Sequence, residues 1–230
     1  MVWYDDFMVI NNPLIYSATQ KTERADTSIV KSVRNLGLDI SLQINLENIS
    51  ALSEVYNQIL DISLERNVDC LILVHDDVTL TEDPIPKLEK LFEVYDVIGV
   101  AGCSKAEINS PALWHLMGGG FGGGNLHGSV DHNVDGEVFN TYFGPYPHRV
   151  VMIDGVFMAF NRKAIETVRF DELNPCKYHF YDMNLLNYHN SGALKFGVGD
   201  IKIIHESPGL REFTNDWRTG ESYFISKYEL

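Results

Sequence analysis

A histidine and two adjacent carboxylates follow a strongly apolar segment. The stretch LILVHDDV, residues 71–78, contains His75, Asp76 and Asp77. Neighbouring carboxylates repel each other and lose hydration when buried, so a chain that needed only to end a strand would use Gly or Asn. Carboxylates at the carboxyl end of a strand are suitable ligands for Mg²⁺ or Mn²⁺, and such a metal would hold a diphosphate. We therefore expect a functional site here, the alternative being a turn that uses Asp77 as a cap.

Two later segments carry further candidate groups. Asp182 stands in HFYDMNLL, residues 179–186, among aromatic residues that would raise its pKa and suit it to act as a general base. A simple N-cap is an equally good interpretation. His205 ends IKIIH, residues 201–205, where an imidazole would complete a metal shell begun by Asp77, although a hydrogen-bonded structural histidine is common at such a position.

The glycine-rich stretch GGGFGGG, residues 118–124, formally contains G-x-G-x-x-G. No clear strand precedes it, no helix follows it, and it lacks the Lys of a P-loop, so we interpret it as a flexible lid rather than a dinucleotide site. Irregularly spaced histidines nearby favour a polar loop over a second metal site: His115, His127, His132 and His148. The sequence has neither G-x-S-x-G nor a recognisable Cys-His motif, which argues against a nucleophilic hydrolase.

The elements that must position these residues follow from hydrophobic periodicity. Short apolar runs alternate with helical patterns over the first 100 residues, which predicts parallel strands joined by crossover helices. We predict strands at 7–12, 40–48, 70–77 and 97–103. We predict helices at 51–67, with Ser50 as N-cap, and at 83–95.

The second half begins with a region that has no clear periodicity. We predict a long loop from Lys105 to about His148, then a strand over 149–160 that contains Asp154 and Gly155. A short helix follows the strand. The remaining predicted elements are a helix over 180–192 ended by Gly192, a strand over 201–205 and a helix over 215–230.

Composition limits the class of protein. The chain has 230 residues, 45% of them hydrophobic, which allows one substantial core. Its formal net charge of −14 argues against nucleic-acid and anionic-membrane partners. Asp5 and Asp6 stand where a secretory signal carries positive charge, and no apolar run is long enough to span a bilayer, so we expect a soluble, cytoplasmic protein. Three scattered cysteines predict reduced thiols.

The order of these parts resembles the GT-A glycosyltransferases, and most closely family 2 and its small relatives with HDD in place of Asp-x-Asp. The resemblance spans about residues 40–209 and rests on HDD, DGVFMAFNRK, FDE, FYDMNL and the late IIH. It implies a single GT-A-type (Rossmann-like) α/β domain over 1–230, with a mostly parallel central sheet flanked by helices. Its parts would be a nucleotide-binding half at 1–104, a flexible Gly-rich loop region at 105–149, and an acceptor and catalytic half with a C-terminal helix at 150–230.

The resemblance also implies roles for individual residues. Asp77 would be the metal ligand that bridges to the diphosphate, His205 a late metal ligand, and Asp182 the catalytic base. The donor-binding residues would be Glu47, Asn57, His75, Asp76 and Asp154. The implied cofactor is manganese or magnesium, and the implied donor is a nucleoside-diphosphate sugar, UDP-sugar being favoured, with an acceptor glycan or small molecule.

The implied function is transfer of a hexose to an acceptor hydroxyl by an inverting, metal-dependent glycosyltransferase. Two alternatives remain. A metal-dependent nucleotidyltransferase would also use acidic residues at a strand end, and would need two metal-bridging acids with a basic residue for a triphosphate. A non-catalytic nucleotide- or sugar-binding relative would keep the cleft and lose the chemistry.

Overall fold

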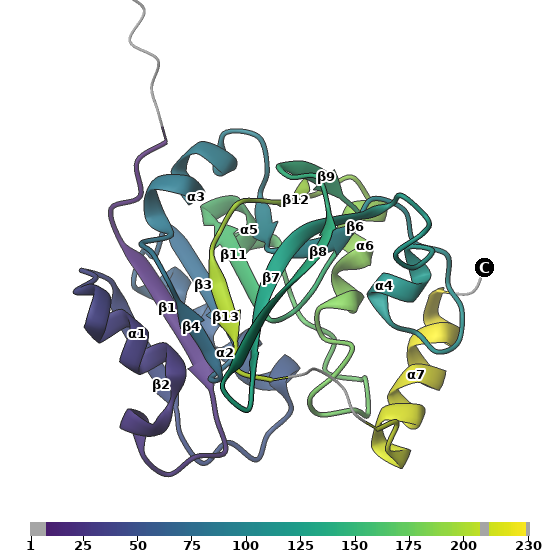
Figure 1. Cartoon of the computed structure of the whole chain (residues 1–230), viewed down its shortest axis with the longest axis horizontal. Coiled ribbons are helices and arrows are strands. Elements are labelled where there is room, and N and C mark those ends of the chain that lie inside the picture. Colours follow the sequence, from purple (N-terminus) through teal and green to yellow (C-terminus); the bar gives the residue numbers. More distant parts are fainter. Residues whose placement is uncertain (1–7, 208–211, 229–230) are drawn as a thin grey trace, which may run out of the picture.

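The computed structural model describes residues 8–207 and 212–228 and has an α/β architecture (Figure 1). Within these residues the main sheet has seven strands, in the order β2-β1-β3-β11-β5-β12-β9. Strands β11 and β9 run opposite to the other five. The strands are β2 (Ser41–Asn45), β1 (Pro13–Ala18), β3 (Cys70–Val74), β11 (Phe157–Asn161), β5 (Val97–Gly99), β12 (Phe196–Val198) and β9 (His148–Val150).

A second sheet packs beside the first and brings distant segments together. Its order among the described residues is β10-β6-β7-β13-β4, with β8 paired to β7. The long β7–β8 hairpin projects at the front of the molecule in Figure 1. The strands are β4 (Val78–Leu80), β6 (Ala101–Cys103), β7 (Leu126–Val134), β8 (Glu137–Gly144), β10 (Met152–Ile153) and β13 (Ile203–His205).

Helices cover both faces of the main sheet. The helices are α1 (Ser28–Leu36), α2 (Leu52–Glu65), α3 (Ile85–Phe92), α4 (Trp114–Met117), α5 (Arg162–Thr167), α6 (Leu186–Asn190) and α7 (Asn215–Tyr228), with short 3₁₀ turns at Arg24–Asp26 and Met183–Leu185. Helices α1 and α3 belong to one hydrophobic cluster, and α2 and α5 to the other. The prediction of an α/β fold is therefore confirmed.

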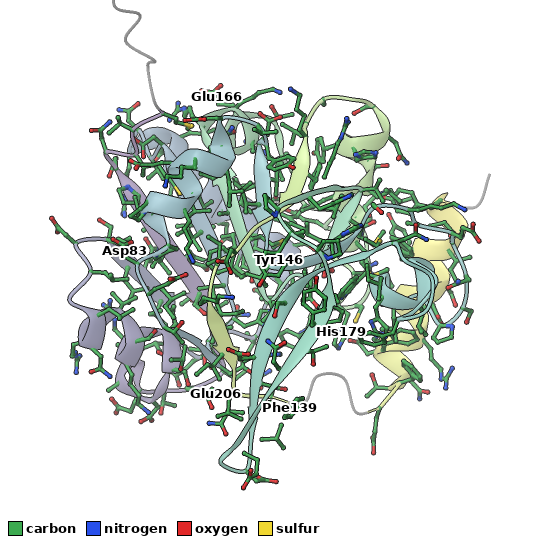
Figure 2. The ribbon with its side chains drawn as sticks, turned by 45° about the horizontal axis from the view of Figure 1, so that its top comes forward. Asp83, Phe139, Tyr146, Glu166, His179 and Glu206 are labelled. Atoms are coloured by element: carbon green, nitrogen blue, oxygen red, sulfur yellow. The ribbon has the colours of Figure 1, made fainter. Side chains whose placement is uncertain are left out.

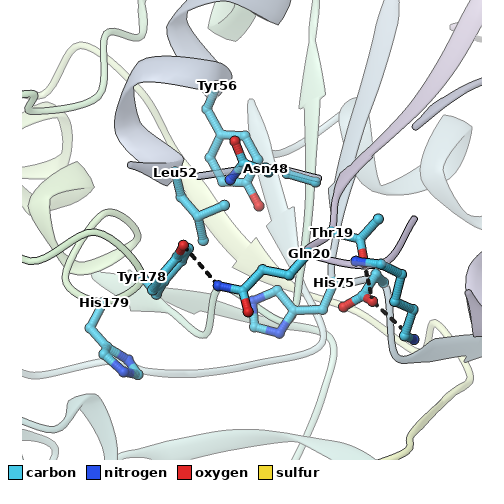
Figure 3. A pocket seen from close by; sticks show the side chains of 11 residues that line it. Thr19, Gln20, Asn48, Leu52, Tyr56, His75, Tyr178 and His179 are labelled. Carbon is cyan, nitrogen blue, oxygen red and sulfur yellow. Dashed lines mark hydrogen bonds and ion pairs between the residues drawn. The ribbon is translucent and has the colours of Figure 1, made fainter. Parts of the chain in front are cut away.

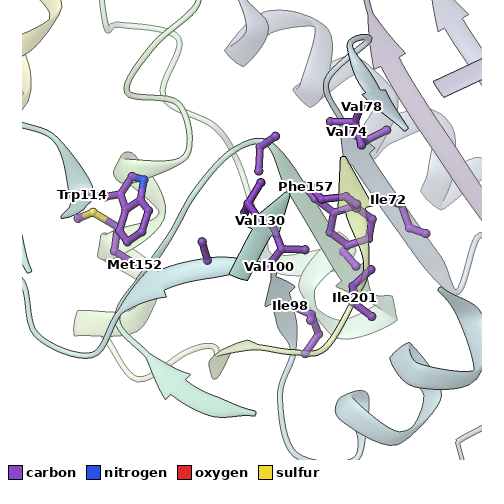
Figure 4. Packing of buried hydrophobic residues seen from close by; sticks show 14 of the residues in the cluster. Ile72, Val74, Val78, Ile98, Val100, Trp114, Val130, Met152, Phe157 and Ile201 are labelled. Atoms are coloured by element: carbon purple, nitrogen blue, oxygen red, sulfur yellow. The ribbon is translucent and has the colours of Figure 1, made fainter. Parts of the chain in front are cut away.

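Strand β3 contributes to both clusters, as a strand covered on each face must. Cys70, Ile72 and Val74 pack in the first cluster, and Leu71 and Leu73 in the second. Figure 4 shows Ile72 and Val74 of β3 in the same cluster as Ile98 and Phe157 of the neighbouring strands. The Ile72 side chain is fully buried. Truncating it to Ala would therefore cost about 2–5 kcal/mol of stability.

The first strand lies about one strand length further along the chain than predicted. Residues 8–12 are not in a strand, and residue 7 lies outside the described residues. The first strand is β1, which starts at Pro13. Pro is tolerated as the first residue of a strand. Asn11 and Asn12 instead donate their backbone N–H groups to the carboxylate of Asp69 at 2.8 and 3.0 Å.

The predicted loop from Lys105 to His148 is also wrong for much of its length. It contains α4 and the β7–β8 hairpin, whose strands pair up to Val134 and Glu137. The two residues between them, Asp135 and Gly136, have φ of 55° and 90°, as a tight two-residue hairpin turn requires. The Asp-Gly dipeptide between strands is thus the signal that identifies this hairpin.

Other predicted elements are present with shorter bounds. The strand predicted over 149–160 is divided into β9, β10 and β11. The helix predicted over 180–192 is a 3₁₀ turn followed by α6, and Ala51 rather than Ser50 is the N-cap of α2. The helix predicted over 215–230 is α7, and residues 229–230 lie outside the described residues.

The three cysteines are buried and free, in agreement with the prediction of reduced thiols. No helix in the described part of the chain combines the length and apolar character that crossing a membrane requires.

Candidate functional site

Three adjacent parallel strands, β2, β1 and β3, end at one edge of the main sheet, and the residues after each strand line a cavity there. This first cavity has a volume of about 590 Å³. Its lining includes Thr19, Gln20 and Lys21 after β1, Asn48 after β2, and His75 and Asp76 after β3. Ligands of open α/β sheets bind at such an edge. The fold therefore places HDD where the sequence analysis expected it.

Polar contacts organise the first cavity. The Asp76 carboxylate accepts a hydrogen bond from the Thr19 hydroxyl at 2.7 Å and lies 3.0 Å from the Lys21 ammonium. Gln20 donates to the Tyr178 hydroxyl at 2.9 Å across the cavity, as Figure 3 shows. Amide and hydroxyl groups of this kind can hydrogen-bond a polar heterocycle, and Lys21 supplies a positive charge.

A second cavity, of about 1000 Å³, adjoins the first. His75, Tyr178 and His179 line both cavities. The second cavity is also lined by Asp77, Asp154, Asp182 and His205. The structure thus brings together six of the eight residues predicted from the sequence, counting His75 and Asp76 at the first cavity.

His75, Asp77 and His205 could hold a metal ion. One candidate ligand atom from each of them lies within 4.8 Å of the others. The pairing of β4 with β13 causes this proximity, because it sets His205 opposite Val78 and lets Glu206 donate its backbone N–H to the Asp77 carbonyl at 2.9 Å. Sheet pairing therefore brings His205 close to residues that lie more than a hundred positions earlier in the sequence.

The unmet hydrogen bonding of Asp77 fits a metal at this cluster. Its Oδ1 atom is buried, accepts no hydrogen bond from any described residue, and lies 3.5 Å from the His205 Nε2 atom. A buried carboxylate oxygen without a donor is costly unless a cation satisfies it. His75 Nε2 lies 2.7 Å from the Tyr181 hydroxyl, a contact that orients the imidazole as the outer partners of metal-bound histidines do. The donor set therefore fits a divalent cation.

The electrostatics of the cluster keep the carboxylate charged. Burial would raise the pKa of Asp77, but His205 and His75 hold it below its ordinary value. Burial lowers the pKa of His75 and favours a neutral imidazole with a lone pair to offer a metal, whereas the Asp77 carboxylate outweighs burial and raises the pKa of His205.

Asp182 is a partly buried carboxylate that lines the second cavity. Burial, followed by repulsion from Asp154, raises its pKa to about 7. It precedes the 3₁₀ turn at Met183–Leu185, and its two oxygens accept hydrogen bonds from the Met183 N–H at 2.9 Å and the Gly155 N–H at 2.8 Å. Asp182 therefore caps a helical turn, as one interpretation predicted, and it also faces the second cavity.

The backbone next to Asp182 is strained. Phe180 has φ of 66°, which is unusual for a bulky residue. Its ring is buried against Trp217 and Phe224 of α7, with ring centroids 5.3 and 5.8 Å apart, and its carbonyl accepts from the Asn184 side chain at 2.8 Å. These contacts hold the strained conformation, which sets the position of Asp182.

Two predicted donor-binding residues line neither cavity. Glu47 is exposed beyond β2, and its neighbour Asn48 lines the first cavity instead. The Asn57 amide donates to the Phe170 carbonyl at 3.0 Å and accepts from the Phe170 N–H at 2.8 Å, so it joins α2 to the segment after α5. The structure therefore gives Asn57 a packing role.

Sequence reasoning missed most of the first cavity. Thr19, Gln20 and Lys21 follow β1, and placing that strand at residues 7–12 removed the signal that would have identified them. Trp114 is a further site residue: its indole N–H donates to the Asp154 carboxylate at 2.8 Å, and its ring lines the second cavity.

Comparisons with known proteins give distant similarities. No protein-family profile matches the chain. The streptomycin biosynthesis protein StrF of Streptomyces griseus is 25% identical to it over 181 residues, which are 76% of this chain and 60% of StrF. The matched region thus spans less than two thirds of that relative.

Solved structures show a similar fold. The crystal structure of A197 from STIV aligns with a TM-score of 0.50 and 14% sequence identity, over 89% of this chain and 99% of that protein. A glycosyltransferase involved in the glycosylation of the major capsid of PBCV-1 aligns over 94% of this chain and 100% of its own, with 12% identity and a TM-score of 0.42. The first of these similarities concerns the fold alone, and the second is too low to support a comparison.

Proposed function

We propose that this protein is an inverting, metal-dependent glycosyltransferase that moves a hexose from a nucleoside-diphosphate sugar to an acceptor hydroxyl. The observation that carries the proposal is that two cavities meet at His75, which belongs to a cluster able to hold a metal ion, and that a carboxylate of raised pKa lines the second cavity. A group-transfer enzyme needs this arrangement, because donor and acceptor must meet at one point while their remaining parts are held separately.

The first cavity would hold the nucleoside of the donor, with UDP-sugar as the favoured class. Asn48 and Gln20 offer amide groups to a base, and Tyr178 offers aromatic surface. Lys21 would face the phosphates, after exchanging part of its contact with Asp76.

His75, Asp77 and His205 would hold the metal next to the diphosphate. When bound, a divalent cation offsets the negative charge that grows on a departing diphosphate. Two imidazoles and one carboxylate favour Mn²⁺ over Mg²⁺, which prefers oxygen ligands. Neighbouring groups would orient this cluster. The Tyr181 hydroxyl contacts His75, and the pairing of β4 with β13 sets the positions of Asp77 and His205.

Asp182 would remove the proton from the acceptor hydroxyl as its oxygen attacks the anomeric carbon. A pKa of about 7 makes the carboxylate available near neutral pH and still basic enough to take a proton. Because one nucleophile, activated by one base, would displace the diphosphate in a single step without a covalent enzyme intermediate, the configuration at the anomeric carbon would invert. Asp154, held by Trp114, would bind the sugar or acceptor beside it.

A thermal-shift screen of nucleotide sugars tests the proposal. Wild type and Asp77→Asn are incubated with a panel of nucleoside-diphosphate sugars and nucleoside triphosphates, with and without Mn²⁺. We expect one nucleoside-diphosphate sugar to stabilise the wild type in the presence of metal, with a much smaller shift in the variant. A larger shift with a triphosphate would favour a nucleotidyltransferase. Donor binding without any turnover on long incubation would indicate a binding protein.

A further inference from the structure

The walls of the second cavity are unusually rich in aromatic rings. Trp114, Phe121 and Phe143 line one side, and Phe180, Phe213 and Trp217 line another. In the first group the Trp114 and Phe143 centroids lie 5.0 Å apart, and the Phe121 and Phe143 rings stack at 5.5 Å with an interplanar angle of 17°. In the second group the Phe213 and Trp217 centroids lie 4.3 Å apart.

One ring of each group is exposed while its neighbour is buried. Phe121 is 66% exposed and Phe213 is 39% exposed, whereas Trp114 and Trp217 are 7% and 2% exposed. The buried tryptophans anchor the walls, and the exposed phenylalanines leave apolar surface open at the cavity. An exposed apolar surface that lines a cavity of this size is typical of a binding site.

Carboxylates outnumber the other charged side chains among the described residues that line the second cavity. Four carboxylates line it: Asp77, Asp154, Asp182 and Glu206. The described lining residues include no Lys and no Arg. Asp154 and Asp182, which lie outside the cluster of His75, Asp77 and His205, would therefore repel an anionic ligand.

The chemistry of the lining defines what fits. Carboxylates accept hydrogen bonds from ligand hydroxyls, and aromatic faces attract the C–H groups of a saturated ring or a cationic amino group. A ligand that offers many hydroxyl donors and an apolar ring face is a carbohydrate. A hydrocarbon chain would offer these carboxylates no hydrogen-bond donor, and an acidic sugar would place a negative charge beside Asp154 and Asp182.

Resting on the proposed function, we infer that the acceptor is a carbohydrate without anionic groups, neutral or amino-substituted, whose ring stacks on Phe121 at the mouth of the second cavity. Phe121 is held against Phe143 on the glycine-rich stretch 118–124. This stretch borders open space, since a Cβ at Gly120, Gly122 or Gly124 would meet no atom within 4 Å other than those of its chain neighbours. Phe121 is thereby a positioning residue for the acceptor.

Direct binding of matched sugars tests the inference. Glucose, glucosamine, glucuronic acid and glucose 6-phosphate, with the corresponding galactose set, are titrated while tryptophan fluorescence is recorded, because Trp114 and Trp217 both line the cavity. Each titration is done alone and with Mn²⁺ and the nucleoside diphosphate. We expect neutral or amino sugars to bind and their acidic counterparts to bind at least tenfold more weakly.

Variants locate the binding. Phe121→Ala is expected to weaken the neutral or amino sugar about three- to tenfold, as loss of one aromatic stacking contact implies. The matched control is Tyr142→Ala, because Tyr142 is 58% exposed on β8 and alternation puts it on the opposite strand face from Thr141 and Phe143, which line the cavity.

The outcomes separate this inference from the proposed function. Equal or tighter binding of the acidic sugars, no binding of any sugar under either condition, or an equal effect of Phe121→Ala and Tyr142→Ala would overturn the inference. None of these results depends on recognition of a donor, which the thermal-shift screen tests. If no nucleotide sugar raises the melting temperature of the wild type in that screen, the proposed function is instead overturned.

Discussion

Gly155 lies where almost no side chain fits, and Gly155→Ala should therefore disturb the candidate site. A Cβ at this position would lie 2.3 Å from the Tyr181 hydroxyl oxygen and 2.7 Å from the ring carbon that carries it. Ordinary contact begins at 3.4 Å, so the hydroxyl must move by about 1.1 Å, the difference between 3.4 and 2.3 Å. The Tyr181 ring is 3% exposed and packs against Tyr56 and Phe170 at centroid distances of 5.3 and 6.4 Å.

The displacement has two measurable consequences. Overpacking a filled core costs about 1–3 kcal/mol. In a protein of this size that lowers the melting temperature by about 2–12 °C. A shift of about 1 Å also breaks the 2.7 Å contact between Tyr181 and His75 and disturbs the Gly155 N–H that holds Asp182, which predicts a loss of about 10²-fold in turnover.

Differential scanning fluorimetry, Mn²⁺ titration and turnover measure these effects. Gly122→Ala is the matched control, because a Cβ there meets nothing within 4 Å and the backbone of neither glycine is left-handed. Gly155→Ala combined with Tyr181→Phe removes the 2.3 Å contact and leaves the 2.7 Å one, so it should recover part of the lost stability. If Gly155→Ala has the same melting temperature and metal affinity as Gly122→Ala, the predicted displacement of Tyr181 is wrong.

Three further predictions follow from the site and its surroundings. Asp182→Asn should lower turnover about 10²- to 10⁴-fold while donor binding is retained. The wild-type rate should rise with pH through about 7, because the deprotonated carboxylate is the active form. A pH profile that is the same in wild type and variant would exclude this role. Mn²⁺ should stabilise the wild type more than Mg²⁺ and lose most of its effect in Asp77→Asn, whereas equal stabilisation by both metals would contradict the two-imidazole cluster. Because burial raises the pKa of Cys103 to about 12 and of Cys176 to about 11, neither thiol should react quickly with a disulfide reagent at pH 8 before the protein unfolds, and fast labelling of the native state would disprove their burial.

The strand that positions HDD could be predicted from the sequence for a simple reason. Residues 70–74 are apolar without interruption, and only a strand covered on both faces requires that pattern. The expectation that ligands lie beyond its carboxyl end then placed His75, Asp76 and Asp77 at a cavity. Asp182 was found because its aromatic neighbours suggested burial, which the structure confirms as the main cause of its raised pKa.

The rest depended on signals that were misread or are not local. The first strand was predicted over residues 7–12, whereas β1 begins at Pro13, so Thr19, Gln20 and Lys21 were not expected at the site. The Asp135-Gly136 turn was hidden by the polar and glycine-rich residues around it. The proximity of Asp77 and His205 follows from β4–β13 pairing across more than a hundred residues, which no local periodicity reveals.

Release of nucleoside diphosphate from a nucleotide sugar is the most direct test of the proposed glycosyltransferase activity. Purified protein is incubated with each donor and Mn²⁺, with and without neutral and amino-sugar acceptors, and the nucleotide and sugar products are measured by mass spectrometry for wild type and Asp182→Asn. We expect nucleoside diphosphate and a glycosylated acceptor in equal amounts from the wild type, and very little of either from the variant. Stable donor with every acceptor, despite metal-dependent donor binding, would contradict it.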